Sequence, residues 1–136
     1  MNSFLNNLVE VSGNENATSV DGGLVSDIKG FISTGSYTLN ALLSGSLYGG
    51  IPNNKITALA GEQATGKTFF CFNILKTFLD DNPEGVVLYF DSEQAITSHM
   101  FEERGIDSTR VAVFPVSTIE EFRHQMIQVA DTYRAE

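Results

Sequence analysis

Short apolar runs alternate with longer amphipathic stretches along the chain from residue 55 onward. The runs predict strands, because a strand covered on both faces of a parallel sheet is continuously apolar; they span 55–60, 86–90 and 111–114. The other stretches repeat apolar residues at helical spacing, over 68–79, 97–104 and from 117 onward. A strand–helix order repeated three times requires right-handed crossovers, so the sequence predicts an α/β fold with a parallel sheet.

The predicted helices carry start and stop signals. Asp81-Asn82-Pro83 ends the first helix, and Gly105 suits the left-handed residue that closes the second. Ser117 and Glu120 have the spacing of a capping box at the start of the third. Its apolar residues then follow at helical intervals: Ile119, Phe122, Met126, Val129, Ala130 and Tyr133.

The chain before residue 55 does not show this repeated order of strand and helix. Residues 1–10 predict a short helix, and residues 12–23 are rich in Ser, Asn and Gly, which predicts a flexible linker. A further helix is expected over Tyr37–Leu43, capped by Ser36. We therefore divide the chain into residues 1–23, an N-terminal helix and linker, and residues 24–136, which carry the α/β pattern.

The composition of the chain limits the classes of function that it can have. The 136 residues are 42% hydrophobic, enough for one globular domain, and no apolar run approaches the roughly 18 residues that cross a bilayer. The single cysteine and the lack of a signal sequence predict a reducing, cytoplasmic setting without membrane association. The net charge of −9 argues against a nucleic-acid grip within these residues, since phosphate binding needs clustered cations.

One segment fits G-x-x-x-x-G-K-[ST], the phosphate-binding loop, in full. It comprises Gly61, Glu62, Gln63, Ala64, Thr65, Gly66, Lys67 and Thr68. The two glycines let successive backbone N–H groups turn toward phosphate oxygens, and the following helix presents its positive N-terminal end. Lys67 can reach the β- and γ-phosphates, and the Thr68 hydroxyl can bind Mg²⁺. The segment predicts a nucleotide-phosphate site.

The run that begins at Val86 ends in two acids, Asp91 and Glu93. A buried strand of this kind delivers its carboxylates to the edge of the sheet where a nucleotide binds. Two interpretations remain open. In the first, Asp91 is the Walker-B acid that holds Mg²⁺ through water. In the second, this strand is an intervening one, and Glu93 orients the attacking water.

Several segments together resemble the RecA/Rad51 recombinase family, and most closely its phage members of the UvsX type. They are residues 32–45, Gly49-Gly-Ile-Pro, Lys55–Gly61, the phosphate loop and Tyr89–Glu93, followed by 95–97, 104–107 and 110–116. The resemblance spans roughly residues 30–134 and is more specific than the phosphate loop alone. It implies that residues 24–136 are the N-terminal part, roughly the first half, of a RecA-like ATP-binding core.

The resemblance also implies roles and partners. ATP and Mg²⁺ would be the cofactors, residues 61–68 the phosphate loop, Thr68 a Mg²⁺ ligand and Glu93, with Lys67, the catalytic pair. The parent protein would form a homo-oligomeric filament on single-stranded DNA, pair homologous strands and hydrolyse ATP in a DNA-dependent manner. Its Walker-B strand and DNA-binding loops are expected after residue 134. The chain alone is therefore expected to be weakly active or inactive, whether it is a truncated, split or partial gene product.

Some positions depart from the family or fit other interpretations. The adenine-stacking aromatic of the family corresponds to Met100, with Phe101 beside it, and the role of Gln63 is open. Cys71 is expected to pack against the sheet, whereas His99 and His124 show no ligand spacing and no acid–base partners. A RecA-core helicase or clock-type ATPase, or a non-catalytic nucleotide-binding fragment, are the alternative functions.

Overall fold

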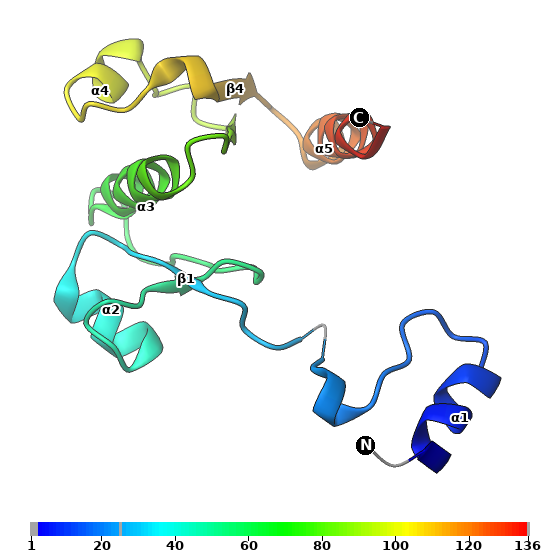
Figure 1. The fold of residues 1–136 in the computed structure, drawn as a ribbon. Coiled ribbons are helices and arrows are strands. Elements are labelled where there is room, and N and C mark those ends of the chain that lie inside the picture. Colours follow the sequence, from blue (N-terminus) through cyan, green and yellow to red (C-terminus); the bar gives the residue numbers. More distant parts are fainter. Residues whose placement is uncertain (1–2, 25, 136) are drawn as a thin grey trace.

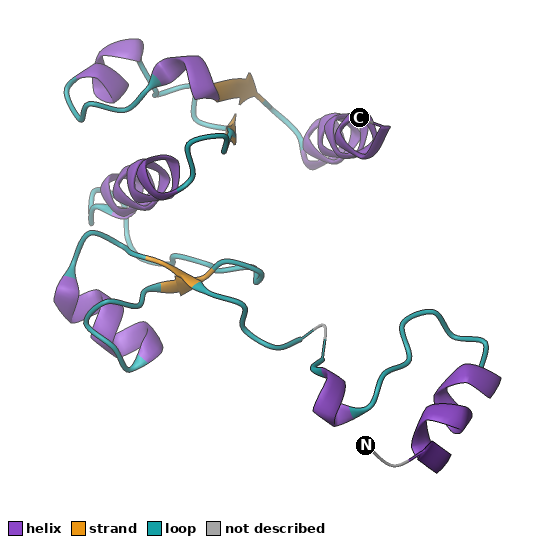
Figure 2. Cartoon of the chain, viewed as in Figure 1, coloured by secondary structure: helices purple, strands orange, loops and turns teal. Residues whose placement is uncertain are grey.

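The computed structural model describes residues 3–24 and 26–135 (Figure 1). Its helices and strands follow one another along the chain in the order drawn in Figure 2. They are α1 (Ser3–Val11), β1 (Phe31–Ile32), α2 (Tyr37–Ser44), β2 (Ile51–Pro52), α3 (Lys67–Asp81), β3 (Val87–Asp91), α4 (Ser98–Glu102), β4 (Val111–Pro115) and α5 (Ile119–Ala135), with short 3-10 turns at Val20–Gly22 and Ser108–Arg110. The result is an α/β fold, as predicted.

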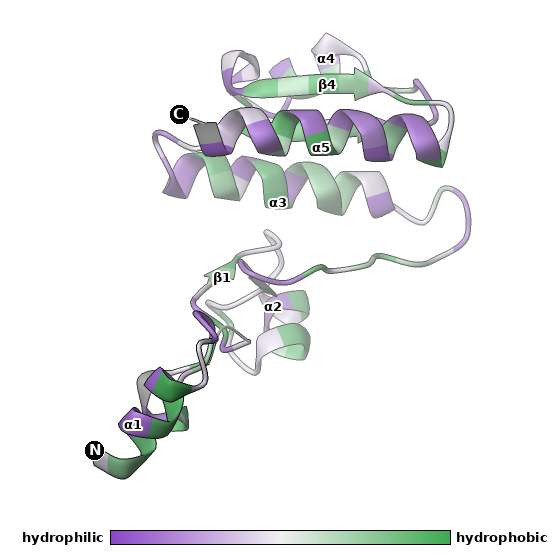
Figure 3. Ribbon diagram, turned by 90° about the vertical axis from the view of Figure 1, so that its right-hand side faces the viewer, coloured by the Kyte–Doolittle hydropathy of each residue, from purple (hydrophilic) through white to green (hydrophobic). Residues whose placement is uncertain are grey.

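The N-terminal helix and the linker after it lie away from the other helices in both views (Figures 1 and 3). α1 confirms the helix predicted over residues 1–10, except that Met1 and Asn2 lie outside the described residues. The first described contacts with the rest of the molecule come after the linker, at residues 26 and 27. There, Asn54 Nδ2 donates a hydrogen bond to Asp27 O at 2.7 Å, and Lys55 Nζ donates one to Ser26 O.

A small unit precedes the phosphate loop. β1 and β2 pair antiparallel, with Ile32 opposite Ile51. α2 confirms the predicted helix: the Ser36 side chain caps its start, and Gly45, at φ +74°, closes it in the left-handed conformation. α2, β1 and β2 together form the part of the molecule that lies below α3 in Figure 1.

A buried polar network holds this unit together, and the sequence did not reveal it. Thr34 and Asn40 are almost fully buried. Asn40 Oδ1 accepts hydrogen bonds from the Thr34 backbone N–H at 2.9 Å and from its hydroxyl at 2.8 Å. Asn40 Nδ2 donates to Ser33 Oγ and to Leu47 O. Every polar atom of the Asn40 amide thus has a partner, which removes the cost of burying it.

The second part is a parallel pair of strands with a helix on each face. β3 pairs with β4 in parallel, Val87 opposite Val111, which confirms the parallel sheet. Side chains alternate between faces along β3. Val87 and Tyr89 pack on the core formed with α3, whose buried members are Phe72, Leu75, Leu79, Phe101 and Ile106. On the other face Phe90 stacks on Phe114 at 5.0 Å between ring centroids and meets Phe122 of α5 edge-on at 4.9 Å.

Two strand predictions need correction. Residues 55–60 form no strand in the described structure, and the Ile56 side chain is fully exposed. β3 was expected to be buried on both faces, yet Leu88 is 40% exposed. Both differences have one cause: an apolar run becomes a buried strand only when neighbouring strands and helices cover it. β3 has a described partner on one edge, and residues 55–60 have none.

Two helix ends also differ from the prediction. α4 spans only Ser98–Glu102, and the turns after it, rather than the helix itself, reach Gly105 at φ +60°. α5 begins one residue later than its capping-box spacing indicated. Thr118 Oγ1, rather than the Ser117 hydroxyl, accepts the hydrogen bond from the Glu121 backbone N–H at 3.1 Å, and Glu121 Oε2 accepts from the Ser117 N–H. Thr118 therefore caps the helix in place of Ser117, and Glu121 binds the residue before the cap.

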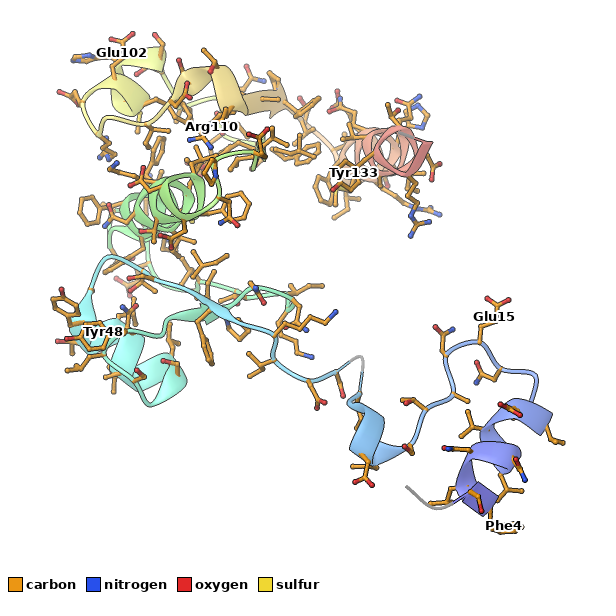
Figure 4. All side chains as sticks on the ribbon, viewed as in Figure 1. Phe4, Glu15, Tyr48, Glu102, Arg110 and Tyr133 are labelled. Carbon is orange, nitrogen blue, oxygen red and sulfur yellow. The ribbon has the colours of Figure 1, made fainter. Side chains whose placement is uncertain are left out.

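Arg110, labelled in the upper part of Figure 4, joins the end of α3 to the start of β4. Its guanidinium donates to four carbonyl oxygens around the helix end, those of Leu79, Asn82, Pro83 and Gly85, at 2.9–3.4 Å. Its Nε donates to Asp107 Oδ2 at 3.1 Å. Hydrogen bonds from the Thr109 hydroxyl and backbone N–H, and then from Arg110, lower the pKa of Asp107. One cation thus binds carbonyls at the end of α3 and in the turn that follows it.

We expect Arg110→Lys to destabilise this part of the chain. A lysine ammonium keeps the charge but cannot present the planar fork of donors that reaches several carbonyls at once. The expected loss is about 1–2 kcal/mol in the free energy of unfolding, measured by urea denaturation. Arg123→Lys, an exposed site on α5, serves as the matched control and should change stability by no more than about 0.5 kcal/mol. Equal effects of the two substitutions would contradict the role of the guanidinium.

Candidate functional site

The predicted phosphate loop is an exposed turn that leads directly into α3. Gly66, at φ +92°, is the residue before the helix, and Ala64 also has a positive φ, +62°. Positive φ is costly for alanine, so the loop holds a backbone conformation that its sequence does not favour locally. The side chain of Thr65 stabilises this turn, since its hydroxyl donates to Glu62 O at 2.8 Å.

Lys67 extends back across the loop. Its ammonium donates hydrogen bonds to Gly61 O at 2.8 Å and to Glu62 O at 2.6 Å. The cation therefore lies over the mouth of the turn, at the N-terminal end of α3, where the first backbone N–H groups of a helix have no partner within it. A cation and free N–H groups at one place form a site for an anion with several oxygens.

The loop and Glu93 line the same hollow, although they are 25 or more residues apart in the sequence. This hollow of about 650 Å³ is bounded by Gln63, Ala64, Thr65, Gly66, Lys67, Thr68 and Glu93. Its lining joins the start of α3 to the segment after β3. All the predicted site residues except Gly61 and Glu62 thus border one space, and those two bind Lys67 through their carbonyls.

Asp91 has a different position from Glu93. Its side chain is buried, and Oδ1 accepts hydrogen bonds from the backbone N–H groups of Glu93 and Gln94, both at 3.1 Å. Oδ2 accepts from the Ile96 N–H at 3.3 Å. Both oxygens are engaged in folding the segment 92–96, in which Gln94 adopts φ +51°. Of the two acids, only Glu93 borders the hollow of the phosphate loop, whereas both border the smaller hollow beside it.

A smaller hollow adjoins the first. Its lining includes Thr68, Glu93, Ile96 and Met100, so Thr68 and Glu93 border both spaces. Phe101, the alternative to Met100 as a contact for a nucleotide base, is buried in the core with its ring 4.8 Å from that of Phe72. Of the two candidates, only Met100 borders a space that a ligand could enter.

The remaining candidate side chains have structural environments. Cys71 is half-buried, and burial raises the pKa of its thiol, which disfavours the reactive thiolate. Burial, followed by the nearby charges of Cys71, Asp91 and Glu93, also raises the pKa of Tyr89. The expectation that His99 has no acidic partner was wrong, because its Nε2 lies 3.3 Å from Glu103 Oε1 on the exposed surface of α4.

Metal-binding chemistry at the site would rest on few protein ligands. Within residues 3–24 and 26–135 no three His, Cys, Asp or Glu side chains converge as a metal site would require. The Thr68 hydroxyl and the Glu93 carboxylate beside the loop nevertheless fit a Mg²⁺ ion that is bound mainly by phosphate oxygens and water, as this ion prefers.

None of the described helices is long and apolar enough to cross a membrane.

Comparisons with known proteins cover most of the chain. No protein-family model matches it. It is 31% identical over 93 residues to the recombination and repair protein of Enterobacteria phage T4. The matched region is 68% of this chain and 24% of the T4 protein. It is 27% identical to protein RecA of Bdellovibrio bacteriovorus over 109 residues, which are 80% of the chain. It is 30% identical to protein RecA of Helicobacter pylori over 101 residues, which are 74% of the chain. The chain spans about a quarter of the length of these relatives.

Proposed function

We propose that this chain, which is related in sequence to the RecA-family recombinases, is the ATP-binding portion of a recombinase of that family. The predicted resemblance to RecA and to the phage recombinase UvsX is confirmed by the matches to these proteins. The observation that carries the proposal for this chain is the hollow that the phosphate loop shares with Glu93. It brings an anion site and a carboxylate together at the carboxyl end of a parallel sheet, where α/β proteins bind nucleotides.

Each side chain would have a distinct task. The loop N–H groups and the Lys67 ammonium would bind the β- and γ-phosphates, and nucleotide binding would exchange the present contacts of Lys67 with Gly61 O and Glu62 O for phosphate oxygens. Thr68 would hold Mg²⁺, which neutralises charge on the phosphates. Glu93 would accept a hydrogen bond from the attacking water and orient it toward the γ-phosphate.

DNA binding would lie mainly outside these residues. The chain carries a net charge of −9, and its acids lie mainly after residue 80. A phosphate backbone would be repelled by such a surface. In the parent protein, ATP-dependent filament formation on single-stranded DNA, homologous pairing and strand exchange would therefore depend on segments other than this one.

Nucleotide binding by the chain tests the proposal directly. A fluorescent ATP analogue should bind saturably in the presence of Mg²⁺ and should be displaced by ATP and ADP. The affinity of AMP should be at least about tenfold lower than that of ATP, because AMP lacks the β-phosphate that the loop and Lys67 would bind. Failure of millimolar ATP to displace the analogue would contradict the proposal.

Measurements of ATP hydrolysis distinguish the proposed recombinase from the alternative functions. We expect the chain alone to bind ATP weakly and to show no stimulation of ATP hydrolysis by single-stranded DNA, since its net charge of −9 repels a phosphate backbone. DNA-stimulated turnover by the chain would show that it is a complete enzyme. ATP binding without turnover in the full-length parent would favour the non-catalytic alternative, and unwinding of duplex DNA by that parent without strand exchange would favour a RecA-core helicase.

A further inference from the structure

The smaller hollow beside the phosphate loop is bordered by two different helices. Thr68, at the start of α3, lines it on one helix, and Met100 lines it on α4. The end of β3 and the segment after it complete the lining of this space of about 300 Å³. In Figure 1 α4 lies above α3. The shape of the hollow therefore depends on how α4 is held on α3.

α4 is too short to be stable by itself. It has five residues, and the side chain of its N-cap residue, Thr97, makes no capping hydrogen bond. A helix of this length forms too few backbone hydrogen bonds to offset the cost of ordering it. Its position must come from contacts with α3, and one of these is the Phe101 ring, 4.8 Å from the ring of Phe72.

Arg104, two residues after α4, makes a second contact with α3. Its Nη1 donates a hydrogen bond to Met100 O at 2.9 Å. The guanidinium carbon lies 5.1 Å from the centroid of the Phe72 ring and 5.9 Å from that of Phe69. A cation over an aromatic ring within about 6 Å of its centroid is attracted to the ring. One side chain thus joins the backbone of Met100 to two rings on the first turns of α3.

Stability alone does not account for an arginine at this position. The Nε of Arg104 is buried and has no hydrogen-bond partner among the described residues, and an unpaired buried N–H group costs free energy. A leucine or methionine would cover the fully buried Phe72 without that cost. What arginine adds is the hydrogen bond to Met100 O, and Met100 is the residue that borders the hollow.

We propose that Arg104 positions Met100 for contact with the base of the bound nucleotide. It would hold the backbone of Met100 against the first turns of α3, so that the thioether stays at the hollow that Thr68 also borders. A thioether in contact with an aromatic ring is favourable, and a nucleotide base is such a ring. Arg104 lines neither hollow, so it would act through Met100 and not as a ligand. This inference rests on the proposed function.

Two ligands test the inference, MgATP and magnesium tripolyphosphate, which has the phosphate chain but no base. Both are measured by displacement of a fluorescent ATP analogue. Arg104→Leu should weaken the binding of ATP about five- to tenfold, because Met100 would no longer be held at the hollow. The binding of tripolyphosphate should change less than about twofold, since the loop and Lys67 are untouched. Arg123→Leu, at an exposed site on α5, is the matched control and should leave both affinities unchanged.

A double-mutant cycle tests whether Arg104 acts through Met100. Met100→Ala should cause the same selective loss of ATP affinity. Adding Arg104→Leu to that variant should weaken ATP binding by no more than a further factor of about two, because the contact that Arg104 supports is already gone. Urea denaturation shows whether each variant folds. Arg104→Met, which keeps an unbranched chain over the Phe72 ring, serves where Arg104→Leu does not fold.

Two results would overturn the inference: an Arg104→Leu variant that loses no more affinity for ATP than for tripolyphosphate, and additive losses in the cycle. It would also be overturned if the unsubstituted chain bound ATP no more tightly than tripolyphosphate, because the base would then add nothing to binding. The proposed function would survive all three results. If the unsubstituted chain bound neither ligand, the proposed function would be wrong, and this inference with it.

Discussion

Lys67→Ala is expected to weaken the binding of ATP to this chain about 100-fold, equivalent to about 3 kcal/mol. The ammonium lies over the loop, 2.6–2.8 Å from two carbonyl oxygens, at the place where the β- and γ-phosphates would bind. It is the one side-chain cation that borders the hollow among the described residues. Charge-assisted hydrogen bonds to phosphate are about twice as strong as neutral ones, so their loss should dominate the affinity.

The measurement is a titration with a fluorescent ATP analogue, and Lys76→Ala is the matched control. Lys76 lies on the same helix, partly exposed, and forms an ion pair with Asp80 at 2.9 Å, far along α3 from the loop. That substitution removes the same charge from the chain but should change affinity less than about threefold, because exposed charges at this distance are screened. Equal losses would mean that the effect is one of net charge, and Lys67 would have no specific role.

The sequence predicted local features of the fold better than the assembly of the sheet. Ser36 and the Asp81-Asn82-Pro83 stop signal act on their own backbone, and α2 begins and α3 ends where these residues indicate. Strand 55–60 was predicted from its apolar character alone, but a strand exists only with a partner. In this structure, residues 55–60 have none among the described segments.

In the candidate site, too, local features could be predicted from the sequence and long-range contacts could not. The phosphate loop was recognisable because its residue types are required at fixed spacing, and its proximity to Glu93 followed from the order of strands and helices. The contacts of Arg110 with carbonyls 25–31 residues away, and the pairing of Thr34 with Asn40, carry no sequence signal, since each residue is common in exposed positions as well. The hydrogen bonds of Asp91, which bear on the choice between Asp91 and Glu93, carry no sequence signal either.

Asp91→Ala is expected to destabilise the region of β3 by about 2–4 kcal/mol, whereas Glu93→Gln should leave stability unchanged within about 0.5 kcal/mol. The Asp91 carboxylate accepts three backbone N–H groups, and alanine would leave them without their partner in a partly buried turn. Glu93 is exposed at the hollow, and glutamine preserves its size while removing the charge and the proton acceptor. The two acids, two residues apart, should thus affect different properties.

Urea denaturation and ATP binding, measured on both variants, separate the two interpretations of this strand end. If Glu93 orients water, Glu93→Gln should bind ATP within about threefold of the unsubstituted chain, and in the full-length parent it should lower turnover by about tenfold or more. Asp91→Asn is the third variant, since it keeps one acceptor oxygen and removes the charge. Should Asp91→Asn keep its stability but lose Mg²⁺-dependent binding, while Glu93→Gln has no effect on turnover, Asp91 would be the Walker-B acid. Its backbone hydrogen bonds would then be secondary to metal binding.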